Sequence, residues 1–232
     1  MASLGTIVWS SVGKKVINAI AGLALCAFIT VHLLGNLALL TGKAEAFNKY
    51  AHFLLSTGVA LYFAEAGIVI FLLGHMITGT AVWWNKQTAR PEAYRKSGGA
   101  GNPSRMTLSS RTMIYTGAVL LIFTVLHLIT FKYGPGVAQG YAVTIDGVVM
   151  RDLFRLTVEV FSQPLYVIWY VFAMAFMGFH LRHGFWSAFQ SLGANHPRYM
   201  PVIEGFGFLF AVVMALGFLI IPIVIYLKGG AA

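Results

Sequence analysis

Residues 16–41 read VINAIAGLALCAFITVHLLGNLALLT, an apolar stretch without a charged side chain. A helix needs about 20 predominantly apolar residues to cross the hydrocarbon core of a bilayer, and this stretch is long enough. Four further segments of the same kind follow it along the chain. The sequence therefore predicts an all-α membrane protein with one transmembrane domain over residues 1–232 and five membrane-spanning helices, at residues 13–41, 55–84, 107–132, 163–191 and 203–227.

The composition agrees with a bilayer as the surroundings of these helices. Hydrophobic residues make up 58% of the chain and charged residues 10%, whereas soluble domains carry about 25% charged residues. The formal net charge is +9, but the basic residues lie between the apolar segments, so they indicate topology and no nucleic-acid partner is expected. The first residues have no basic cluster before a short apolar core, and a cleaved signal peptide is not expected.

Lys and Arg residues divide unequally between the two sides that five spans create. The side with the N-terminus carries ten of them and the opposite side six. Because cytoplasmic loops carry an excess of Lys and Arg, we expect a multi-pass protein of the cytoplasmic membrane with its N-terminus in the cytoplasm. The ten are Lys14, Lys15, Lys86, Arg90, Arg95, Lys96, Arg105, Arg111, Arg182 and Arg198, and the six are Lys43, Lys49, Lys132, Arg151, Arg155 and Lys228.

The linker between the third and fourth spans contains a possible turn signal. Residues 141–149 read YAVTIDGVV, in which apolar and polar residues alternate around an Asp-Gly pair. An Asp-Gly pair between alternating segments is typical of a two-residue hairpin turn. This pattern predicts a small β-hairpin outside the bilayer.

Four histidines lie in strongly apolar contexts, one in each of the first four predicted spans. They are His32, His75, His127 and His180. An ionisable side chain at membrane depth costs free energy and indicates a functional site. A single such histidine is as well explained by a hydrogen bond to a neighbouring helix, but one on each of four helices is not.

The depths of these histidines sort them into two layers. With a rise of about 1.5 Å per residue, His32 and His127 lie near the outer ends of their helices, and His75 and His180 lie nearer the cytoplasmic ends. The two layers then differ by roughly 10–15 Å along the membrane normal. Paired neutral imidazoles on facing helices are the ligands of a bis-histidine haem. We therefore predict a four-helix haem-binding bundle with two haem b groups, an outer one between His32 and His127 and an inner one between His75 and His180.

His183 is an alternative to His180 because it lies three residues later on nearly the same helix face. We favour His180 as the ligand, since His183 is closer to the cytoplasmic surface. There, a protonated His183 or Arg182 would suit a haem propionate or a quinone oxygen. Ser11 and Lys14, at the inner end of the first span, are candidates for the same contacts, or for contact with a partner subunit.

On the outer side, Glu65 and Asn36 are the polar candidates. Glu65 is a carboxylate within the second span, ten residues before His75, and so about 15 Å further out along the helix. An acid at that depth can relay protons to a quinone. The competing interpretation is a helix-end glutamate that forms a hydrogen bond to a loop.

The chain resembles the one-polypeptide, two-haem cytochrome b subunit of succinate dehydrogenase and fumarate reductase. The resemblance covers nearly the whole chain and includes the order and spacing of the four histidines. Some fumarate reductases of this type have a proton-conducting glutamate two residues before the fourth ligand, where this chain has Gly178. The segments that carry the resemblance are SSVGKKVINAIAGL at 10–23, FITVHLLGNL at 28–37, AFNKYA at 46–51, NKQTARPEAY at 85–94, SRTMIYTG at 110–117, LHLITF at 126–131 and, most specifically, FHLRHGFWSAFQSLG at 179–193.

The resemblance implies a membrane anchor within respiratory complex II, the succinate dehydrogenase that also serves the tricarboxylic acid cycle. A flavoprotein subunit with FAD would oxidise succinate or reduce fumarate, and an iron–sulfur subunit would pass electrons to the inner haem. The anchor would exchange them with a quinone, commonly menaquinone, and the complex often self-associates. Cys26 is the only cysteine and no glycine-rich nucleotide motif occurs, so FAD and iron–sulfur clusters must belong to partners.

Two other functions are compatible with intramembrane histidines, and a haem-free structural anchor is a third alternative. One is the cytochrome b anchor of a different quinone-linked dehydrogenase, such as a hydrogenase or a formate dehydrogenase. The other is a proton-linked transporter, which would predict broken helices and a polar pathway at the midplane. The predicted spans have no proline near the four histidines, which counts against the transporter.

Overall fold

Five helices of the chain are long and apolar enough to cross a membrane. The computed structural model describes residues 3–89 and 108–228. In that part of the chain the prediction of an all-α membrane protein with five spans is confirmed. The five are α2 (Ser11–Asn36) extended by the 3-10 turn η1 (Leu37–Thr41), α4 (Val59–Thr88), α5 (Leu108–His127) extended by the π-helical turn η2 (Leu128–Lys132), α7 (Pro164–Ser191) and α8 (Met200–Leu227).

The helices begin and end where local chemistry dictates. Ser10 caps α2, because its Oγ accepts a hydrogen bond from Gly13 N at 3.0 Å. After η1 the chain turns away at Gly42, whose φ of 70° lies in the left-handed region that glycine tolerates. Pro164 and Pro201 stand in the first turns of α7 and α8, where the missing N–H has no helical partner to lose.

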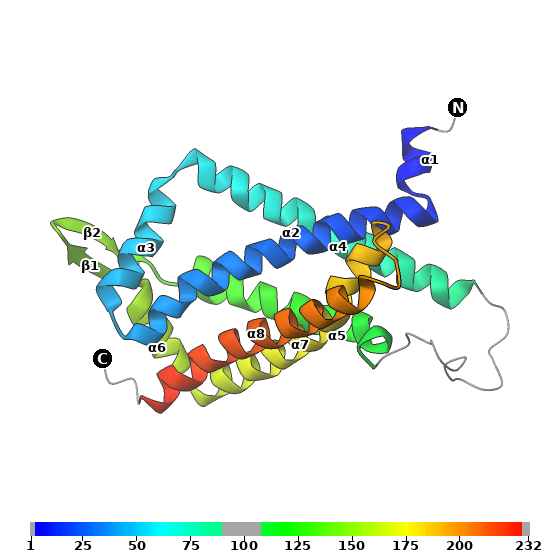
Figure 1. Ribbon diagram of the computed structural model, residues 1–232. Coiled ribbons are helices and arrows are strands. Elements are labelled where there is room, and N and C mark those ends of the chain that lie inside the picture. The colour runs from blue at the N-terminus through cyan, green and yellow to red at the C-terminus, as the bar shows by residue number, and fades with distance from the viewer. Residues whose placement is uncertain (1–2, 90–107, 229–232) are drawn as a thin grey trace.

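The most buried of the five spans is α7, which packs against α2, α5 and α8 (Figure 1). Its residues Ala173, Met174 and Met177 form the centre of the hydrophobic core together with Ala211 and Met214 of α8. The side of α7 that faces away from these contacts carries exposed apolar side chains such as Leu165 and Ile168, as expected of a helix whose outer side lies against lipid, so α7 is apolar around its whole circumference.

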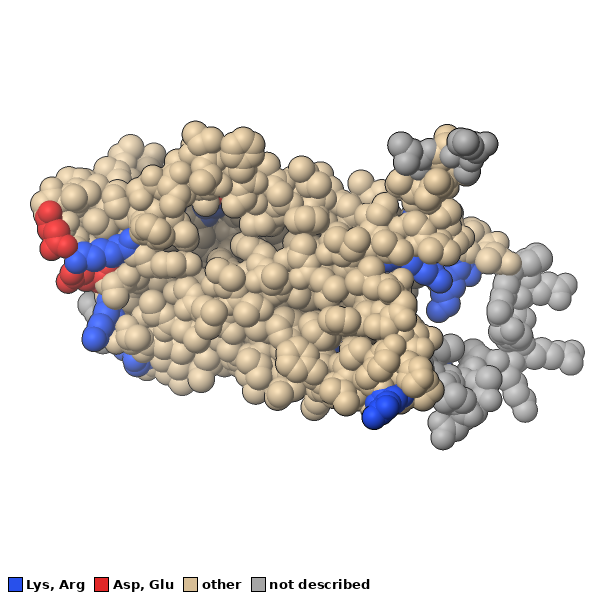
Figure 2. All heavy atoms as spheres, turned by 45° about the horizontal axis from the view of Figure 1, so that its top comes forward, with Lys and Arg blue, Asp and Glu red and all other residues tan. Residues whose placement is uncertain are grey.

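The span α4 lies at the edge of the bundle and packs mainly on α2. Thr78 is its only buried residue. Figure 1 shows that α4 diverges from α2 towards the end where α4 begins, and the surface in Figure 2 is hollowed between the two helices in that region. The hollow lies on the outer half of the bundle, on the side of the predicted outer histidine layer.

Short elements cover the end of the bundle that carries the loops after the first and third spans. The predicted hairpin is confirmed: β1 (Ala142–Ile145) pairs antiparallel with β2 (Val148–Arg151), and Asp146 and Gly147 form its turn with φ values of 52° and 76°. The sequence did not predict the two helices beside it, α3 (Ala44–Ser56) and α6 (Leu153–Phe161), nor the turn η3 (Val137–Gln139). We call α3, the hairpin and α6 the outer cap.

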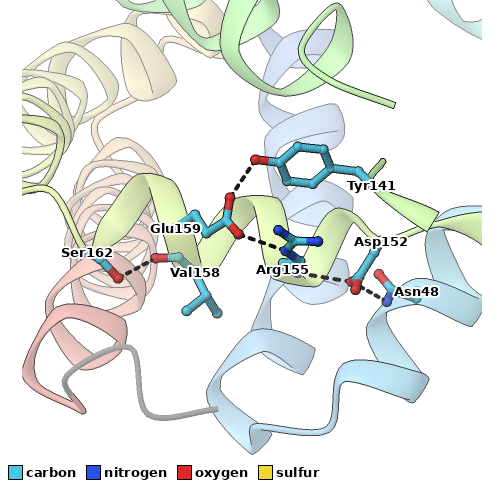
Figure 3. Close-up of polar contacts among 7 residues, drawn as sticks. All are labelled: Asn48, Tyr141, Asp152, Arg155, Val158, Glu159 and Ser162. Atoms are coloured by element: carbon cyan, nitrogen blue, oxygen red, sulfur yellow. Dashed lines mark hydrogen bonds and ion pairs between the residues drawn. The ribbon is translucent and has the colours of Figure 1, made fainter. Parts of the chain in front are cut away.

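Asn48 holds the outer cap together (Figure 3). Its side chain is 1% exposed, its Nδ2 donates to Asp152 Oδ1 at 2.8 Å, and its Oδ1 accepts from Phe154 N at 2.9 Å. Asp152 in turn caps α6 by accepting from Arg155 N. One buried amide therefore connects α3 to the first turn of α6.

Ion pairs on the surface of the outer cap add to this connection. Hydrogen bonds to Asp146 and Glu45 raise the pKa of Lys49 to about 12. In α6, a hydrogen bond from Tyr141 and another from Arg155 lower the pKa of Glu159 (Figure 3). These groups therefore stay charged across the neutral pH range.

The two ends of the described chain lie at opposite ends of the bundle, as five spans require (Figure 1). The short helix α1 (Leu4–Val8) precedes α2 at one end, and the outer cap covers the other. Charged side chains in Figure 2 gather mainly towards these two ends. The cytoplasmic placement of the N-terminus stays a prediction, and four of its basic residues, Arg90, Arg95, Lys96 and Arg105, lie outside the described residues.

Candidate functional site

The two outer histidines of the sequence prediction lie next to each other in the structure, with their rings nearly perpendicular. His32 of α2 and His127 at the end of α5 have ring centroids 5.8 Å apart and ring planes at 88°. Phe28 stacks on His32 at 5.5 Å, and Phe123 stacks on His127 at 5.6 Å. Helix α5 changes to the π-helical turn η2 directly after His127, and such turns frequently mark functional sites. The pair thus lies in an aromatic environment at the outer end of the bundle.

The inner histidines form a second pair of the same kind. His75 of α4 and His180 of α7 have ring centroids 6.0 Å apart and ring planes at 68°. This pair joins two helices that have few other contacts, because α4 packs mainly on α2. Each of the four helices therefore contributes one histidine, and each pair links two helices.

Two contacts fix the distance between the layers. His127 of α5 contacts Tyr170 of α7 in the outer layer, and Thr116 of α5 contacts His180 of α7 in the inner layer. Eleven residues separate the two contacts on α5 and ten separate them on α7, which corresponds to about 15 Å of helix. This distance along the helices is at the upper end of the interval that the sequence predicted along the membrane normal.

The Nδ1 ring nitrogens of three of the four histidines have hydrogen-bond partners that the sequence did not predict. His75 Nδ1 lies 3.2 Å from the carbonyl oxygen of Asn18, which can only accept. His180 Nδ1 lies 2.9 Å from Thr116 Oγ1, whose own proton is donated to Met113 O at 3.1 Å. His75 Nδ1 must therefore carry the proton, and its Nε2 has a free lone pair. His180 has the same tautomer when the Thr116 proton goes to Met113 O. That is the tautomer in which an imidazole binds a metal through Nε2.

His127 has a different partner. Its Nδ1 lies 3.0 Å from the hydroxyl of Tyr170, which is able to donate or accept. For His32, the structure gives a contact through the backbone, since Asn36 Nδ2 donates to His32 O at 2.7 Å. The predicted polar candidate Asn36 thus bonds to its own helix one turn away from His32.

Two glycines lie against the inner rings. A Cβ on Gly22 of α2 would lie 3.3 Å from Cε1 and Nδ1 of His75, and a Cβ on Gly117 of α5 would lie 3.6 Å from Cε1 of His180. Neither glycine is on the helix of the ring that it contacts, so sequence spacing along one helix could not identify them. They let the neighbouring helices approach the imidazoles closely.

His183 lies outside the inner pair. Its ring packs edge-on against Trp186 at 4.9 Å, and its Nδ1 is buried with no hydrogen-bond partner among the described residues. The ring that faces His75 is that of His180. This geometry supports the choice of His180 as the paired residue.

The remaining inner candidates lie in three different surroundings. Ser11 is the exposed first residue of α2. Lys14 is 6% exposed, and its Nζ lies 5.4 Å from the ring centre of Trp9. Arg182 is exposed and lies over the ring of Phe208 in α8, 5.5 Å from its centre. Of the three, only Lys14 is buried near the inner end of the bundle.

Glu65 pairs with a lysine on a neighbouring span. Its Oε1 contacts Nζ of Lys132, the last residue of η2, so the partner is not a loop as the competing interpretation held. About a third of each side chain is exposed. The ion pair connects α4 to the outer end of the α5 span, five residues after His127.

The histidine pairs fit one class of metal group. Two imidazoles on opposite sides of one metal ion, each with a nitrogen–metal bond of about 2.0 Å, have ring centres roughly 6 Å apart. Both pairs have this spacing. Within residues 3–89 and 108–228, no third His, Cys, Asp or Glu joins a pair to make a metal-binding group. The pairs therefore suit an ion whose other ligands come from a macrocycle, as in a haem with two axial histidines.

Gly178, two residues before His180, faces α8. A Cβ there would lie 3.0 Å from Cβ of Ala215, so a longer side chain has no room without a shift of α8. The position therefore serves close packing of α7 and α8 in this chain.

Comparisons of the chain with protein-family models, with curated proteins and with solved structures find no match.

Proposed function

We propose that the chain is a di-haem cytochrome b that anchors a succinate dehydrogenase or fumarate reductase in the membrane and exchanges electrons with a quinone. The observation that carries the proposal is the pairing of four histidines from four spans into two layers, each with the ring spacing of a shared axial-ligand pair. The choice of dehydrogenase rests on the sequence resemblance, above all on residues 179–193.

The chain's own residues have three tasks in this function. Helices α2 and α5 hold the outer pair of imidazoles, and α4 and α7 hold the inner pair. The acceptors Asn18 O and Thr116 Oγ1 keep His75 and His180 in the tautomer with a free Nε2. A haem in each pair would supply reversible one-electron iron chemistry, and the aromatic and aliphatic side chains around it exclude water.

The overall reaction needs partners and a quinone. Succinate loses two electrons and two protons to become fumarate on the flavoprotein subunit, and the quinone gains two electrons and two protons to become a quinol. The iron–sulfur subunit would deliver the electrons to the inner layer, and menaquinone is the expected quinone. Glu65 with Lys132 on the outer side, and Lys14, Ser11, Arg182 and His183 on the inner side, are the candidate quinone and propionate contacts.

The first test is a visible spectrum of the purified chain, dithionite-reduced minus air-oxidised, with a haem assay. We expect two haem b per chain. His75→Ala or His180→Ala should remove the inner haem, and His32→Ala or His127→Ala the outer one. His183→Ala is the matched control and should keep both. A colourless, correctly folded protein would refute the proposal, and loss of a haem in the His183 variant would overturn the assignment of His180.

The second test concerns the partners. Mild solubilisation of the native complex should yield a co-purifying subunit with FAD and one with iron–sulfur clusters, together with succinate-dependent reduction of a quinone. A nickel- or molybdenum-containing partner would instead identify the anchor of a hydrogenase or a formate dehydrogenase.

A further inference from the structure

We propose that Tyr170 and Thr116 each adjust the electron affinity of one haem, the outer and the inner one respectively, through the Nδ1 of a single axial histidine. This inference rests on the proposed function. Both are positioning residues, since each contacts a histidine and neither is placed to bind iron.

Tyr170 is held in one position beside His127. It is 8% exposed, and its ring packs against Phe123 at 4.9 Å, Phe161 at 4.9 Å and Phe131 at 6.2 Å between centroids. These three aromatic rings pack around the phenol ring of Tyr170. In this position its hydroxyl lies 3.0 Å from His127 Nδ1, within hydrogen-bond distance.

Iron binding decides the direction of this hydrogen bond. If Nε2 of His127 binds iron, the ring proton is on Nδ1, and the Tyr170 oxygen must accept it. Among the described residues, His127 is the one hydrogen-bond partner that the structure records for this hydroxyl. Within the described residues, the Tyr170 hydroxyl thus forms its hydrogen bond with the predicted outer ligand His127.

Thr116 has the equivalent place in the inner layer. It is 2% exposed, its hydroxyl donates to Met113 O, and its oxygen is therefore left to accept from His180 Nδ1. Iron on Nε2 of His180 would put the ring proton on Nδ1, so that the Thr116 oxygen accepts it while the threonine proton goes to Met113 O.

An acceptor on Nδ1–H makes the imidazole a stronger electron donor through Nε2. A stronger donor stabilises ferric over ferrous iron, so removal of the acceptor should raise the reduction potential of that haem. The layers are about 15 Å apart along the helices, so each change should act on one haem alone.

The experiment is a potentiometric titration of the purified, haem-loaded protein, followed by the visible spectrum and by the low-spin electron paramagnetic resonance signals. Variants that lack one axial histidine assign each titration component to a layer. In Tyr170→Phe we expect the outer component alone to shift to higher potential. Thr116→Val should shift the inner component alone, and Thr116→Ser, which restores a hydroxyl, should return it. A net hydrogen-bond effect of about 1 kcal/mol corresponds to a change of roughly fivefold in the reduction equilibrium.

The outcomes separate this inference from the proposed function. Failure of the unaltered protein to bind haem refutes the proposed function. Two haems with unshifted potentials in both variants, or equal shifts of both components in each variant, overturn the inference alone. Loss of the outer haem from Tyr170→Phe would show that Tyr170 is needed for haem binding and would overturn its role in setting the reduction potential. The Thr116 variants would then test the inference for the inner haem.

Discussion

At the scale of single residues, the site depends on a few polar contacts between neighbouring helices. Asn18 O and Thr116 Oγ1 contact the inner histidines His75 and His180, and the Tyr170 hydroxyl contacts His127 of the outer pair. Glu65 and Lys132 satisfy each other across two spans. In a membrane span a charge without a counter-charge costs free energy, so the pair is more informative than either residue.

Removal of one charge of the Glu65–Lys132 pair should cost more than removal of both. Glu65→Gln leaves a lysine and Lys132→Gln leaves a carboxylate without its partner, and each should lower stability by about 1–2 kcal/mol. The double variant should be closer to the unaltered protein, which thermal unfolding in lipid-supplemented detergent measures. Strictly additive losses in the double variant would show that the two side chains do not interact.

At the scale of elements, the outer cap shows how short helices are fixed outside the bilayer. Hydropathy does not reveal α3 and α6, because each is short and amphipathic and packs on the end of the bundle. Asn48 connects them, and the ion pairs around Lys49 and Glu159 lie on their surface. Because the pKa of Glu159 is lowered, its small contribution to stability is present above the ordinary pKa of glutamate and is lost on acidification through the lowered value.

Asn48→Ala should loosen the outer cap. The substitution leaves the buried Phe154 N–H without an acceptor, which typically costs about 1–3 kcal/mol. Limited proteolysis should then cut faster between residues 42 and 58, and the unfolding temperature should fall. Ser162→Ala is the matched control, because its exposed hydroxyl donates to Val158 O one turn earlier and does not connect α6 to another element among the described residues (Figure 3). Equal effects of the two substitutions would contradict the role of Asn48.

At the scale of the whole molecule, the five spans place the N-terminal end and the outer cap on opposite sides of the membrane. The structure sets these two ends apart, and the distribution of Lys and Arg predicts that the N-terminal one faces the cytoplasm. The inner histidine pair then lies on the side where the expected dehydrogenase subunits would bind.

Cysteine labelling in intact cells tests this orientation. In a Cys26→Ala background, Val149→Cys in the exposed hairpin should react with a membrane-impermeant maleimide added outside. Asn195→Cys, in the exposed loop between α7 and α8, is the control and should react only after permeabilisation. The reverse pattern would invert the topology and with it the names inner and outer.

The sequence by itself determined the five spans and the two layers of histidines. Both follow from local properties, because apolar length defines a span and a constant rise per residue sets the depth of each side chain along it. The hairpin was predictable for the same reason, since its turn lies within four residues.

Only the tertiary structure decided which atoms meet between helices. Four contacts depend on how each helix is rotated and tilted in the bundle. Tyr170 faces His127, and Asn18 O faces His75. Glu65 pairs with Lys132 rather than with a loop, and His180 rather than His183 faces the ring of His75. Rotation and tilt result from the packing of all the helices together, and no short stretch of sequence encodes them.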